Sequence, residues 1–587
     1  MQIKKINLMK ASDLIADKIE KITDHVFSGQ GGFVIHIMDS LSKKKKLTIV
    51  PSQNEQGASL AADAYYRVSG KLGVVVVTSG PGAINTFQGL ACSFYDSIPS
   101  LYITGAPVTK TLKKNQNLRQ LGFQEMEIKK MVSSFTKYAT RITDVKNISY
   151  EIDKCVYLSQ SGRPGPCLID LPDDIQRMET NLREQKKFYN LKNKIFLNKK
   201  QVQKTVKMIK KSEKPVFVIG HGVKISKNIS GIKRLLKNTG MPYAPTWAMT
   251  EYFDANDKKN IGSFGVYATR YGNFSINSSD LLIILGSRMS GPLIGGNPKL
   301  FAPNAKKIQV DIDSAELKEE NGIKIDLKIN CDVKDFIDSL NKSKIKWKVN
   351  KNWLNKIDNL KNKYPIVQES YYRQRTKVNP YVFFKKLSEL TSPKEIIIPD
   401  ASANLVWAYQ AYVPKKNQKI FTALNHSPMG YSVAAAIGAS MASKRSQVIA
   451  IIGDGSMQMN IQELENIKSH NLPIKIFVIN NNGYGMIKQT MNTWMKGKYV
   501  GCDLKSGLSL PDFKKVSNAY GIHSTSINNH NDLHEKIEYV LKFKGPIVCD
   551  VLLEQNQQII PKVKSGSPIH DMLPSLKKEE IISNLKD

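Results

Sequence analysis

The chain has 587 residues and carries 86 Lys and Arg against 51 Asp and Glu, a formal net charge of +35. That length exceeds one ordinary hydrophobic core, so we expect about two to four domains. With 41% hydrophobic and 23% charged residues, the composition is typical of a globular protein and not of a disordered, fibrous or membrane-spanning one.

We expect no signal for export or membrane insertion. No apolar run approaches the roughly 18–20 residues that a membrane span needs, and the first stretch, MQIKKINLMKASDLIADKIEK, lacks the apolar core of a signal peptide. The six cysteines are scattered, without a CxxC pair, which is typical of reduced thiols. We therefore predict a cytoplasmic protein that does not associate with membranes.

The positive charge allows two interpretations. It could mark a nucleic-acid-binding protein, or it could reflect a Lys-rich composition spread over a solvated surface. The basic residues form no stripe interleaved with aromatic residues, and the sequence contains no nucleic-acid-binding motif. We favour the second interpretation and predict no nucleic-acid partner, although a basic surface would attract anionic substrates.

Three segments alternate short apolar runs with helical stretches, which is the pattern of α/β domains. Residues 1–185 contain LGVVVVTSGPG, SLYITGAP and GPCLIDLP; residues 200–340 contain KPVFVIGHGV, DLLIILGSRMSG and KKIQVDID. Residues 370–560 contain EIIIPDASAN, QVIAIIGDGS, IKIFVINNNG and GPIVCDVLLE, and residues 561–587 form a tail. Such continuous apolar runs suit strands buried on both faces. We predict three doubly wound parallel-sheet domains.

The stretch GDGSMQMNIQELENIKSHNLPIKIFVINNNGYG, residues 453–485, places an acidic turn after one predicted strand and amides after the next. We expect a helix between them that is capped by Asn460, with Glu463 three residues on, and that runs to about His470. Neighbouring strands lie about 5 Å apart, so Asp454 and Asn480 or Asn481 should converge at the edge where α/β sheets bind ligands.

One carboxylate, one amide oxygen and one backbone carbonyl make half of an octahedral shell, which suits Mg²⁺ completed by phosphate and water. Gly453 and Gly455 would let the backbone approach a phosphate closely. The alternative is a plain strand–helix–strand unit with ordinary turn residues. The spacing of the GDGS turn and the NN loop favours a magnesium–diphosphate site.

This stretch resembles the diphosphate motif of thiamine-diphosphate enzymes, in which GDG is followed some two dozen residues later by NN. The resemblance implies that Asp454, Asn481 and the carbonyl of Gly483 hold the metal. It also implies that Gly455 and Ser456 lie near the diphosphate.

Thiamine diphosphate needs a carboxylic acid at N1′ of its aminopyrimidine ring, which then takes a proton from the thiazolium. Glu55 follows the predicted strand LTIV and begins an Ala-rich helix. We expect a buried carboxyl there, with a raised pKa. Alternatively, Glu55 is a helix-start glutamate favoured by the helix dipole. The accompanying GDGS–NN pattern favours the catalytic role.

The first segment resembles the pyrimidine-binding domain of the acetohydroxyacid (acetolactate) synthase family, through EQGASLAADAYYRVSGKLGVVVVTSGPGAINTFQGLACSFYDSIPSLYITG, GFQEMEIKKMVSSFTKYA and SGRPGPCLIDLPDDIQ. The resemblance implies that the SPMGYSVAAAIGA stretch supplies Met429 beneath the cofactor. It implies a homodimer or tetramer in which two chains complete each site, as cofactor pockets at a two-fold interface allow. The other implied active-centre and cofactor contacts are Gly31, Gly32, Gln124, Lys137, Pro81, Asn85 and Asn404.

The second segment resembles the FAD-binding middle domain of the same family, through GSFGVYATRYGNFSINSSDLLIILGSRMSG and IQVDID. Glycine and arginine at strand ends suit a pyrophosphate, and the flavin of most relatives is structural. The alternative is a middle domain that binds no cofactor. The implied flavin contacts are Gly220, Gly222, Arg270, Gly286, Arg288, Asp311 and Asp332.

Several residues depart from the family pattern. Thr490 stands where synthases of branched-chain amino-acid biosynthesis carry a tryptophan, Phe33 follows the glycine pair, and ASAN leaves Ala403 and Asn404 near the diphosphate. The tail and KGKYVGCDLKSGLSLPDF look more like enzymes of surface-polysaccharide sugar pathways, some of which act on nucleotide-linked keto sugars.

The function expected from this resemblance is a carboligase. It would decarboxylate a 2-keto acid, pyruvate first, and add the two-carbon unit to a second carbonyl compound. The alternatives are the keto-sugar enzyme, a simple decarboxylase, a flavin-linked 2-keto-acid oxidase and a catalytically silent cofactor-binding partner. The acceptor and the need for a regulatory subunit stay open.

Overall fold

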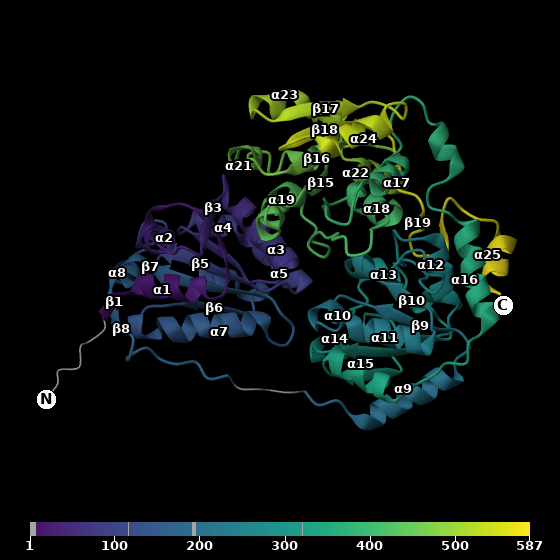
Figure 1. Cartoon of the computed structure of the whole chain (residues 1–587), viewed down its shortest axis with the longest axis horizontal. Coiled ribbons are helices and arrows are strands. Elements are labelled where there is room, and N and C mark those ends of the chain that lie inside the picture. Colours follow the sequence, from purple (N-terminus) through teal and green to yellow (C-terminus); the bar gives the residue numbers. More distant parts are fainter. Residues whose placement is uncertain (1–7, 116, 191–194, 320, 587) are drawn as a thin grey trace.

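The computed structural model describes residues 8–115, 117–190, 195–319 and 321–586. Three parallel sheets, each flanked by helices, follow one another along the chain (Figure 1). The predicted architecture of three parallel-sheet α/β domains is confirmed. All six cysteines are buried free thiols. Within the described ranges, no helix combines the length and apolarity that crossing a bilayer requires.

The first domain is built on a six-stranded sheet of order β3-β2-β4-β5-β7-β6, in which every pairing is parallel. Its central strand β4 has the sequence GVVVV and is buried throughout, because helices cover both faces of the sheet. The strands are β2 His25–Gly29, β3 Thr48–Pro51, β4 Gly73–Val77, β5 Ser100–Ala106, β6 Tyr138–Arg141 and β7 Pro166–Pro172, and β1 Leu8–Lys10 pairs antiparallel with β8 Glu179–Asn181. The helices are α1 Ala11–Glu20, α2 Ile35–Ser42, α3 Glu55–Ser69, α4 Pro81–Asn85, α5 Phe87–Asp96, α6 Ile128–Met131, α7 Ile148–Gln160 and α8 Asp173–Arg177.

The middle domain has a five-stranded parallel sheet of order β10-β9-β11-β12-β13. The strands are β9 Pro215–Ile219, β10 Tyr243–Pro245, β11 Leu281–Leu285, β12 Lys306–Asp311 and β13 Leu327–Asn330. The helices are α9 Lys199–Lys211, α10 Gly222–Ile225, α11 Ile229–Thr239, α12 Arg270–Ser278, α13 Gly291–Ile294, α14 Ser314–Lys318, α15 Val333–Lys342 and α16 Lys351–Lys363.

The third domain also has a five-stranded parallel sheet, of order β14-β15-β16-β18-β17. The strands are β14 Ile396–Pro399, β15 Val448–Gly453, β16 Ile474–Asn480, β17 His523–Ile527 and β18 Ile547–Leu552. The helices are α17 Pro380–Leu390, α18 Ala403–Ala411, α19 Tyr431–Ala442, α20 Asp454–Met457, α21 Glu463–Ser469, α22 Gly485–Trp494, α23 Phe513–Ala519 and α24 Leu533–Lys542.

The tail returns to the middle domain and lies beside α12 and α16 (Figure 1). It contains β19 Lys562–Val563, β20 Met572–Leu573 and α25 Lys578–Leu585. The Asn273 side chain donates to the carbonyl of Ile569 at 2.7 Å, and the hydroxyl of Tyr364 contacts Glu580 at 2.6 Å. The tail therefore anchors the end of the third domain to the second.

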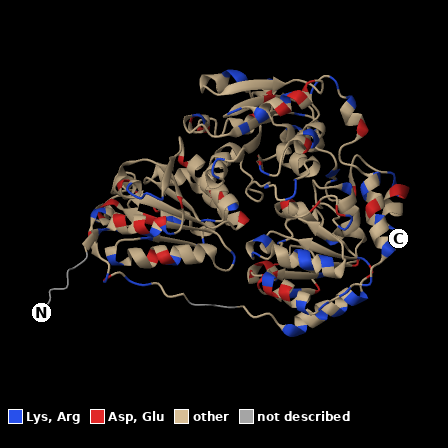
Figure 2. Ribbon diagram, viewed as in Figure 1, with Lys and Arg blue, Asp and Glu red and all other residues tan. Residues whose placement is uncertain are grey.

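Charged residues of both signs are spread over helices of all three domains (Figure 2). α9 alone contains six lysines, and its buried residues are Val202, Thr205 and Ile209. This distribution agrees with a solvated basic surface.

Two helices join the first domain to the third. α3 and α19 lie side by side (Figure 1), and they approach so closely that a Cβ on Gly438 would lie 1.9 Å from the carbonyl oxygen of Ala61. Only glycine permits such backbone contact.

A buried ionic network accompanies this helix pair. The guanidinium of Arg67 donates to Asp63 at 2.7 Å and to Asp96 at 2.8 Å, and the hydroxyl of Tyr431, from α19, donates to Asp63 at 2.6 Å. Asp63, Arg67 and Asp96 are all buried. Burial opposes the charge on Arg67, but the two carboxylates outweigh it and raise the Arg67 pKa well above its ordinary value.

Replacing Arg67 should therefore destabilise the whole chain. Arg67→Met keeps the apolar stem but leaves two carboxylates buried without a cation, which costs about 3–5 kcal/mol. We expect a clear drop in the thermal midpoint by scanning calorimetry. Arg177→Met is the matched control, because Arg177 pairs with Asp173 at 2.8 Å while its side chain is 50% exposed. Equal midpoints for the two variants would contradict the role of the network.

Candidate functional site

The predicted acidic turn and asparagine loop meet at one edge of the third sheet. β15 and β16 pair in parallel with Gly453 opposite Ile479, and Asp454 begins α20 directly after β15. The carboxylate of Asp454 accepts the backbone N–H of Gly455 at 2.7 Å and that of Gly483 at 3.0 Å. These bonds tie the two loops together.

Asp454 is 3% exposed, and this burial raises its pKa to about 6, although backbone N–H groups counteract the effect. A cation would offset the desolvation of the carboxylate. Asn481 is also buried, and the carbonyl of Gly483 follows two residues later. These three oxygen donors fit the hard-ligand preference of Mg²⁺.

Glycine leaves room for close contacts around Asp454. A Cβ on Gly453 would lie 2.8 Å from Nδ2 of Asn404, and one on Gly455 would lie 2.1 Å from the ring of Tyr484. Ser456 is buried in the first turn after them. The structure thus groups Gly455, Ser456 and Asn404 with Asp454, where a phosphate could be held by backbone N–H groups.

Hydrogen bonds to Asp400 hold the loop that carries Met429. The buried carboxylate of Asp400 accepts the backbone N–H groups of Gly430 at 3.1 Å and Ser432 at 2.8 Å. Met429 itself is half-buried. Its position at the start of α19 is therefore set by a fixed turn.

The expected helix cap after the acidic turn is wrong. α21 begins at Glu463 without a side-chain cap, and it ends at Ser469, next to the expected end. The amide of Asn460 instead donates to the carbonyl of Gly430 at 3.0 Å. The backbone between Met457 and Glu463 turns away from a helix start at Asn460, so its side chain serves the Met429 loop.

Glu55 lies at the carboxyl ends of the strands of the first sheet. It begins α3, with Asn54 as the helix cap, and its Oε2 accepts the amide of Asn85 at 2.9 Å. A Cβ on Gly29 would lie 2.3 Å from the Glu55 side chain. Pro81 begins the helix that ends at Asn85, so the structure brings Glu55, Pro81 and Asn85 together. Glu55 is half-buried in the single chain, less than the sequence suggested.

The glycine pair and Gln124 lie at the same edge. A Cβ on Gly31 would meet the side chain of Thr78 at 2.4 Å, whereas Gly32 faces open space. The carbonyl of Gln124 accepts the hydroxyl of Ser79 at 2.9 Å, and Gln124 has a positive φ of 56°. Such backbone is uncommon for a residue with a side chain and requires support from its neighbours.

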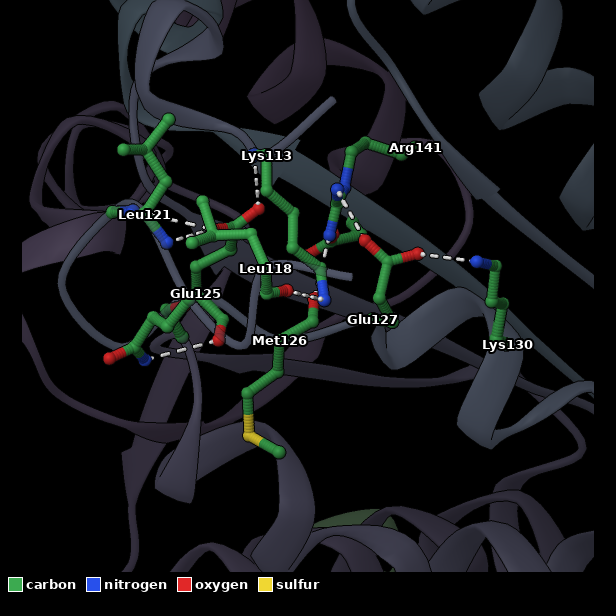
Figure 3. Close-up of polar contacts among 12 residues, drawn as sticks. Lys113, Leu118, Leu121, Glu125, Met126, Glu127, Lys130 and Arg141 are labelled. Carbon is green, nitrogen blue, oxygen red and sulfur yellow. Dashed lines mark hydrogen bonds and ion pairs between the residues drawn. The ribbon is translucent and has the colours of Figure 1, made fainter. Parts of the chain in front are cut away.

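Glu125 supplies that support from inside the loop (Figure 3). Its carboxylate accepts the backbone N–H groups of Lys113 at 2.6 Å, Leu121 at 2.9 Å and Gly122 at 3.3 Å. Arg141 then donates to the carbonyl of Met126 at 2.7 Å. The loop that presents Gln124 is therefore organised by a buried carboxylate.

The structure separates Lys137 from Glu55 within one chain. Lys137 precedes β6 and so lies at the amino-terminal edge of the parallel sheet. Burial lowers its pKa, and its ammonium donates to the carbonyl of Ser161 at 2.5 Å. Lys137 lines a cavity of about 850 Å³ between the first and middle domains, together with Arg163 and Arg288.

A second cavity, of about 710 Å³, lies at the carboxyl ends of the middle-domain strands and is also lined by the first and third domains. Gly222 donates its N–H to the carbonyl of Gly286 at 3.0 Å, and a Cβ on Gly222 would lie 2.7 Å from Cα of Gly286. Burial raises the pKa of Asp311 on its wall to about 6. The predicted flavin contacts that line this cavity are Gly222, Gly286, Arg288, Asp311 and Asp332.

Two predicted flavin contacts lie elsewhere. Arg270 donates to the tail carbonyls of Met572 at 3.4 Å and Pro574 at 2.7 Å. Gly220 lies behind the cavity wall, where a Cβ would meet the carbonyl of Gly286 at 2.3 Å. Arg270 therefore holds the tail, and Gly220 permits the close contact between β9 and the loop after β11.

Glu463 lies near the site but was not predicted from the sequence as a site residue. It is fully buried, and its carboxylate accepts the backbone N–H of Asn54 at 3.2 Å and the amide of Asn466 at 3.3 Å. Asn54 directly precedes Glu55, so Glu463 links the third domain to the start of α3. The sequence signal is weak, because Glu463 stands in a short helix whose other buried residues are Leu464, Asn466 and Ile467.

Comparisons with known proteins agree with this geometry. Three family models match, described as Thiamine pyrophosphate enzyme, N-terminal TPP binding domain (residues 9–131), central domain (202–340) and C-terminal TPP binding domain (400–551). The chain is 31% identical to acetolactate synthase 2, chloroplastic, of Nicotiana tabacum, over 96% of this chain and 85% of that protein. It is 30% identical to the acetolactate synthase large subunit of Cyanidium caldarium over 100% of both, and 32% identical to that of Porphyra purpurea over 94% and 92%.

Glu463 should give the protein a measurable pH dependence. Burial raises its pKa from 4.5 to about 7, so the folded protein binds this proton more tightly than the unfolded chain. Its contribution to stability is complete below pH 4.5 and is lost as the pH rises toward 7, by up to about 3 kcal/mol. Glu463→Gln cannot ionise, so its thermal midpoint should fall less than that of the parent between about pH 5 and pH 8.

Glu465→Gln is the control for this experiment. Glu465 lies in the same helix but is half-exposed. The thermal midpoint of its variant should therefore change between about pH 5 and pH 8 as much as that of the parent protein does. A Glu463→Gln variant that also follows the parent would contradict the inferred titration.

Proposed function

The chain belongs to the acetolactate-synthase-like family of thiamine-diphosphate enzymes, and on that premise we propose that it is a Mg²⁺-dependent carboligase. It decarboxylates a 2-keto acid, pyruvate first, and joins the two-carbon unit to a second carbonyl compound. The observation that carries this proposal is the pairing of a Glu55–Asn85 contact in the first domain with the Asp454–Gly483 loop contact in the third.

The third domain would anchor the cofactor. Asp454, Asn481 and the carbonyl of Gly483 would hold Mg²⁺, and the backbone beside Gly455 and Ser456 would hold the diphosphate. When bound, thiamine diphosphate supplies a nucleophilic carbon and an electron sink for decarboxylation. Met429, held by the Asp400 turn, would support the two rings.

The first domain would supply the proton. Glu55 would hold a proton at N1′ of the aminopyrimidine ring, and Asn85 fixes the orientation of that carboxyl through the 2.9 Å contact. Gly32, which faces open space, leaves room for the substrate, and the neighbouring Gln124 contributes a polar side chain. These groups would orient the reactants.

A second copy of the chain would complete the site. Phe123, beside Gln124, is 77% exposed, and Trp494 and Val500, beyond the metal loop, are 67% and 63% exposed. Large apolar side chains beside polar site residues are typical of a surface that a partner covers. We propose a homodimer in which Glu55 of one chain faces Asp454 of the other.

FAD would occupy the cavity of about 710 Å³ among the three domains. The close approach of Gly222 to Gly286 supports this assignment, because it brings two strand-end loops together on the cavity wall, where glycine lets the backbone come close to a pyrophosphate. The proposed role of the flavin is structural, because it would contact residues of all three domains in this cavity.

A nucleotide-linked keto sugar is the second candidate acceptor. Thr490 is exposed on α22, and its hydroxyl bonds back to the carbonyl of Met486 at 2.9 Å. A small side chain at this place leaves more room than a tryptophan. Acetolactate formed from pyruvate alone would favour the keto-acid acceptor, whereas CO₂ without acetolactate would direct the search to keto sugars.

Glu55→Gln tests the proton role. The variant keeps the shape and a hydrogen-bond partner for Asn85, but it lacks the acid, so turnover of pyruvate should fall by about 10²–10⁴-fold. CO₂ release and acetolactate are measured with thiamine diphosphate, Mg²⁺ and FAD present. Near-full activity would contradict the role of Glu55.

Asp454→Asn provides the complementary control. It should lose Mg²⁺-dependent binding of thiamine diphosphate in titration calorimetry, while Glu55→Gln should bind the cofactor through the intact metal loop. If both variants lost binding, the division between anchoring and proton transfer would be wrong.

Arg288→Met tests the flavin assignment. The guanidinium of Arg288 lines the proposed flavin cavity and contacts the carbonyl oxygen of the Asn425 side chain at 2.5 Å. Its loss should weaken FAD retention about tenfold or more, because charge-assisted hydrogen bonds to phosphate are lost. Flavin content is measured by visible absorbance after purification and desalting. Unchanged retention would place the flavin elsewhere.

A further inference from the structure

A third large cavity, of about 980 Å³, lies in a cleft between the middle and third domains. One wall comes from α11, β10 and residues 251–259, and the other comes from α17 and residues 413–419. It shares no lining residue with the proposed flavin cavity. Its volume is in the range of small-molecule sites, which is about 300–1,000 Å³.

The cleft is strongly cationic. Seven lysines and four acidic residues line it, and the lysines come from both domains. The lysines are Lys233, Lys237, Lys259, Lys385, Lys415, Lys416 and Lys419.

The acidic residues in the cleft are already engaged. Glu251 pairs with Lys224 at 3.3 Å, Asp257 accepts the hydroxyl of Tyr243 at 2.8 Å, and Glu389 pairs with Lys386 at 2.7 Å. Asp254, the fourth, accepts the backbone N–H of Asn256 at 2.9 Å. Two of the four carboxylates are thus paired with lysines outside the cleft lining, and Asp254 and Asp257 alone cannot balance the charge of seven lysines.

The lysines of the cleft have no such partners. Across the part of the chain that the structure describes, none of the seven makes an ion pair within 4.0 Å. Lys419 is half-buried, and burial lowers its pKa although Glu251 opposes the shift. A polyanion in the cleft would stabilise the charged form of these groups.

Aromatic rings lie beside the cations. The rings of Tyr243 and Phe253 are 5.1 Å apart, and the ammonium of Lys233 lies 6.0 Å from the Phe253 ring centroid. Phe253 is half-buried, so part of its surface faces the cleft. A ligand with a flat ring and several phosphates would match this combination of surfaces.

The walls of the cleft are preformed. Glu251 of the middle domain accepts the backbone N–H of Ile420, next to Lys419, at 2.9 Å. The buried Gln418 accepts the N–H of Lys415 at 3.0 Å and donates to the carbonyl of Ser392 at 2.8 Å. The lysine loop is thereby held in place across the domain boundary, as is typical of binding sites that need little reorganisation.

We propose that this cleft binds a nucleoside triphosphate, with Lys233 from the middle domain and Lys419 from the third domain contacting its phosphates. The ligand would bridge the two domains and stabilise their relative position. This site is separate from the flavin and thiamine sites proposed above, so its test does not require catalytic turnover.

The experiment titrates ATP into the full-length protein by calorimetry, with saturating FAD, thiamine diphosphate and Mg²⁺ so that those sites cannot contribute. The double variant Lys233→Gln/Lys419→Gln should bind ATP about tenfold or more weakly, because two charge-assisted contacts to phosphate are lost. The control Lys258→Gln/Lys394→Gln removes the same charge from exposed positions outside the cleft and should bind like the parent.

Each outcome decides the proposal. ATP bound at least about tenfold more tightly than inorganic tripolyphosphate supports a nucleotide site. Equal binding of the two probes contradicts the nucleotide assignment, since only the phosphates would then be recognised. The site itself is overturned if the parent binds neither probe at about 1 mM, or if both double variants weaken equally, which would indicate general charge attraction alone.

Discussion

The contact between α3 and α19 is the constraint on which the arrangement of the domains depends. Glycine at Gly438 lets the two backbones touch, and in the Asp63–Arg67–Asp96 network beside it Asp63 also accepts the hydroxyl of Tyr431 from the third domain. Asp96 also accepts the backbone N–H groups of residues 424 and 425. A charge network of this kind is costly to leave incomplete, so it selects one docking geometry.

Within one chain, that geometry also fixes the relative positions of the two half-sites, each of which would face the complementary half-site of the partner in the proposed homodimer. The strand-end loop with Asp454 and the turn with Met429 belong to the third domain, whereas Glu55 lies at the start of α3. Glu463 connects the two by accepting the N–H of Asn54. The helix that stabilises the domain contact is thus the helix that presents the proposed acid, so packing and positioning are achieved by the same element.

Much of this was predictable from the sequence, for identifiable reasons. Apolar runs such as GVVVV indicate buried strands, and two consecutive strands bring Asp454 and the asparagine loop to one edge. The sequence does not reveal which residues far apart in the chain meet, so the role of Glu463 was missed. For the same reason the sequence did not reveal that Arg270, predicted as a flavin contact, donates to a carbonyl of the tail. Local spacing predicted that Asn460 caps a helix, but in the structure its side chain makes a tertiary hydrogen bond to the carbonyl of Gly430 instead.

The buried network also bears on how the chain is made. Tyr431 follows Asp63 by 368 residues, so a ribosome that adds about 5–20 residues per second completes α19 on the order of 20 to 70 seconds after α3. During that interval α3 can pack against α5, and Asp63 can accept the hydroxyl of Ser93, but the contacts of α3 with α19 and of Asp63 with Tyr431 are missing. The nascent first domain therefore leaves uncovered the Ala-rich face of α3 that later packs against α19, with Asp63 and Arg67 at its centre, until synthesis reaches the third domain.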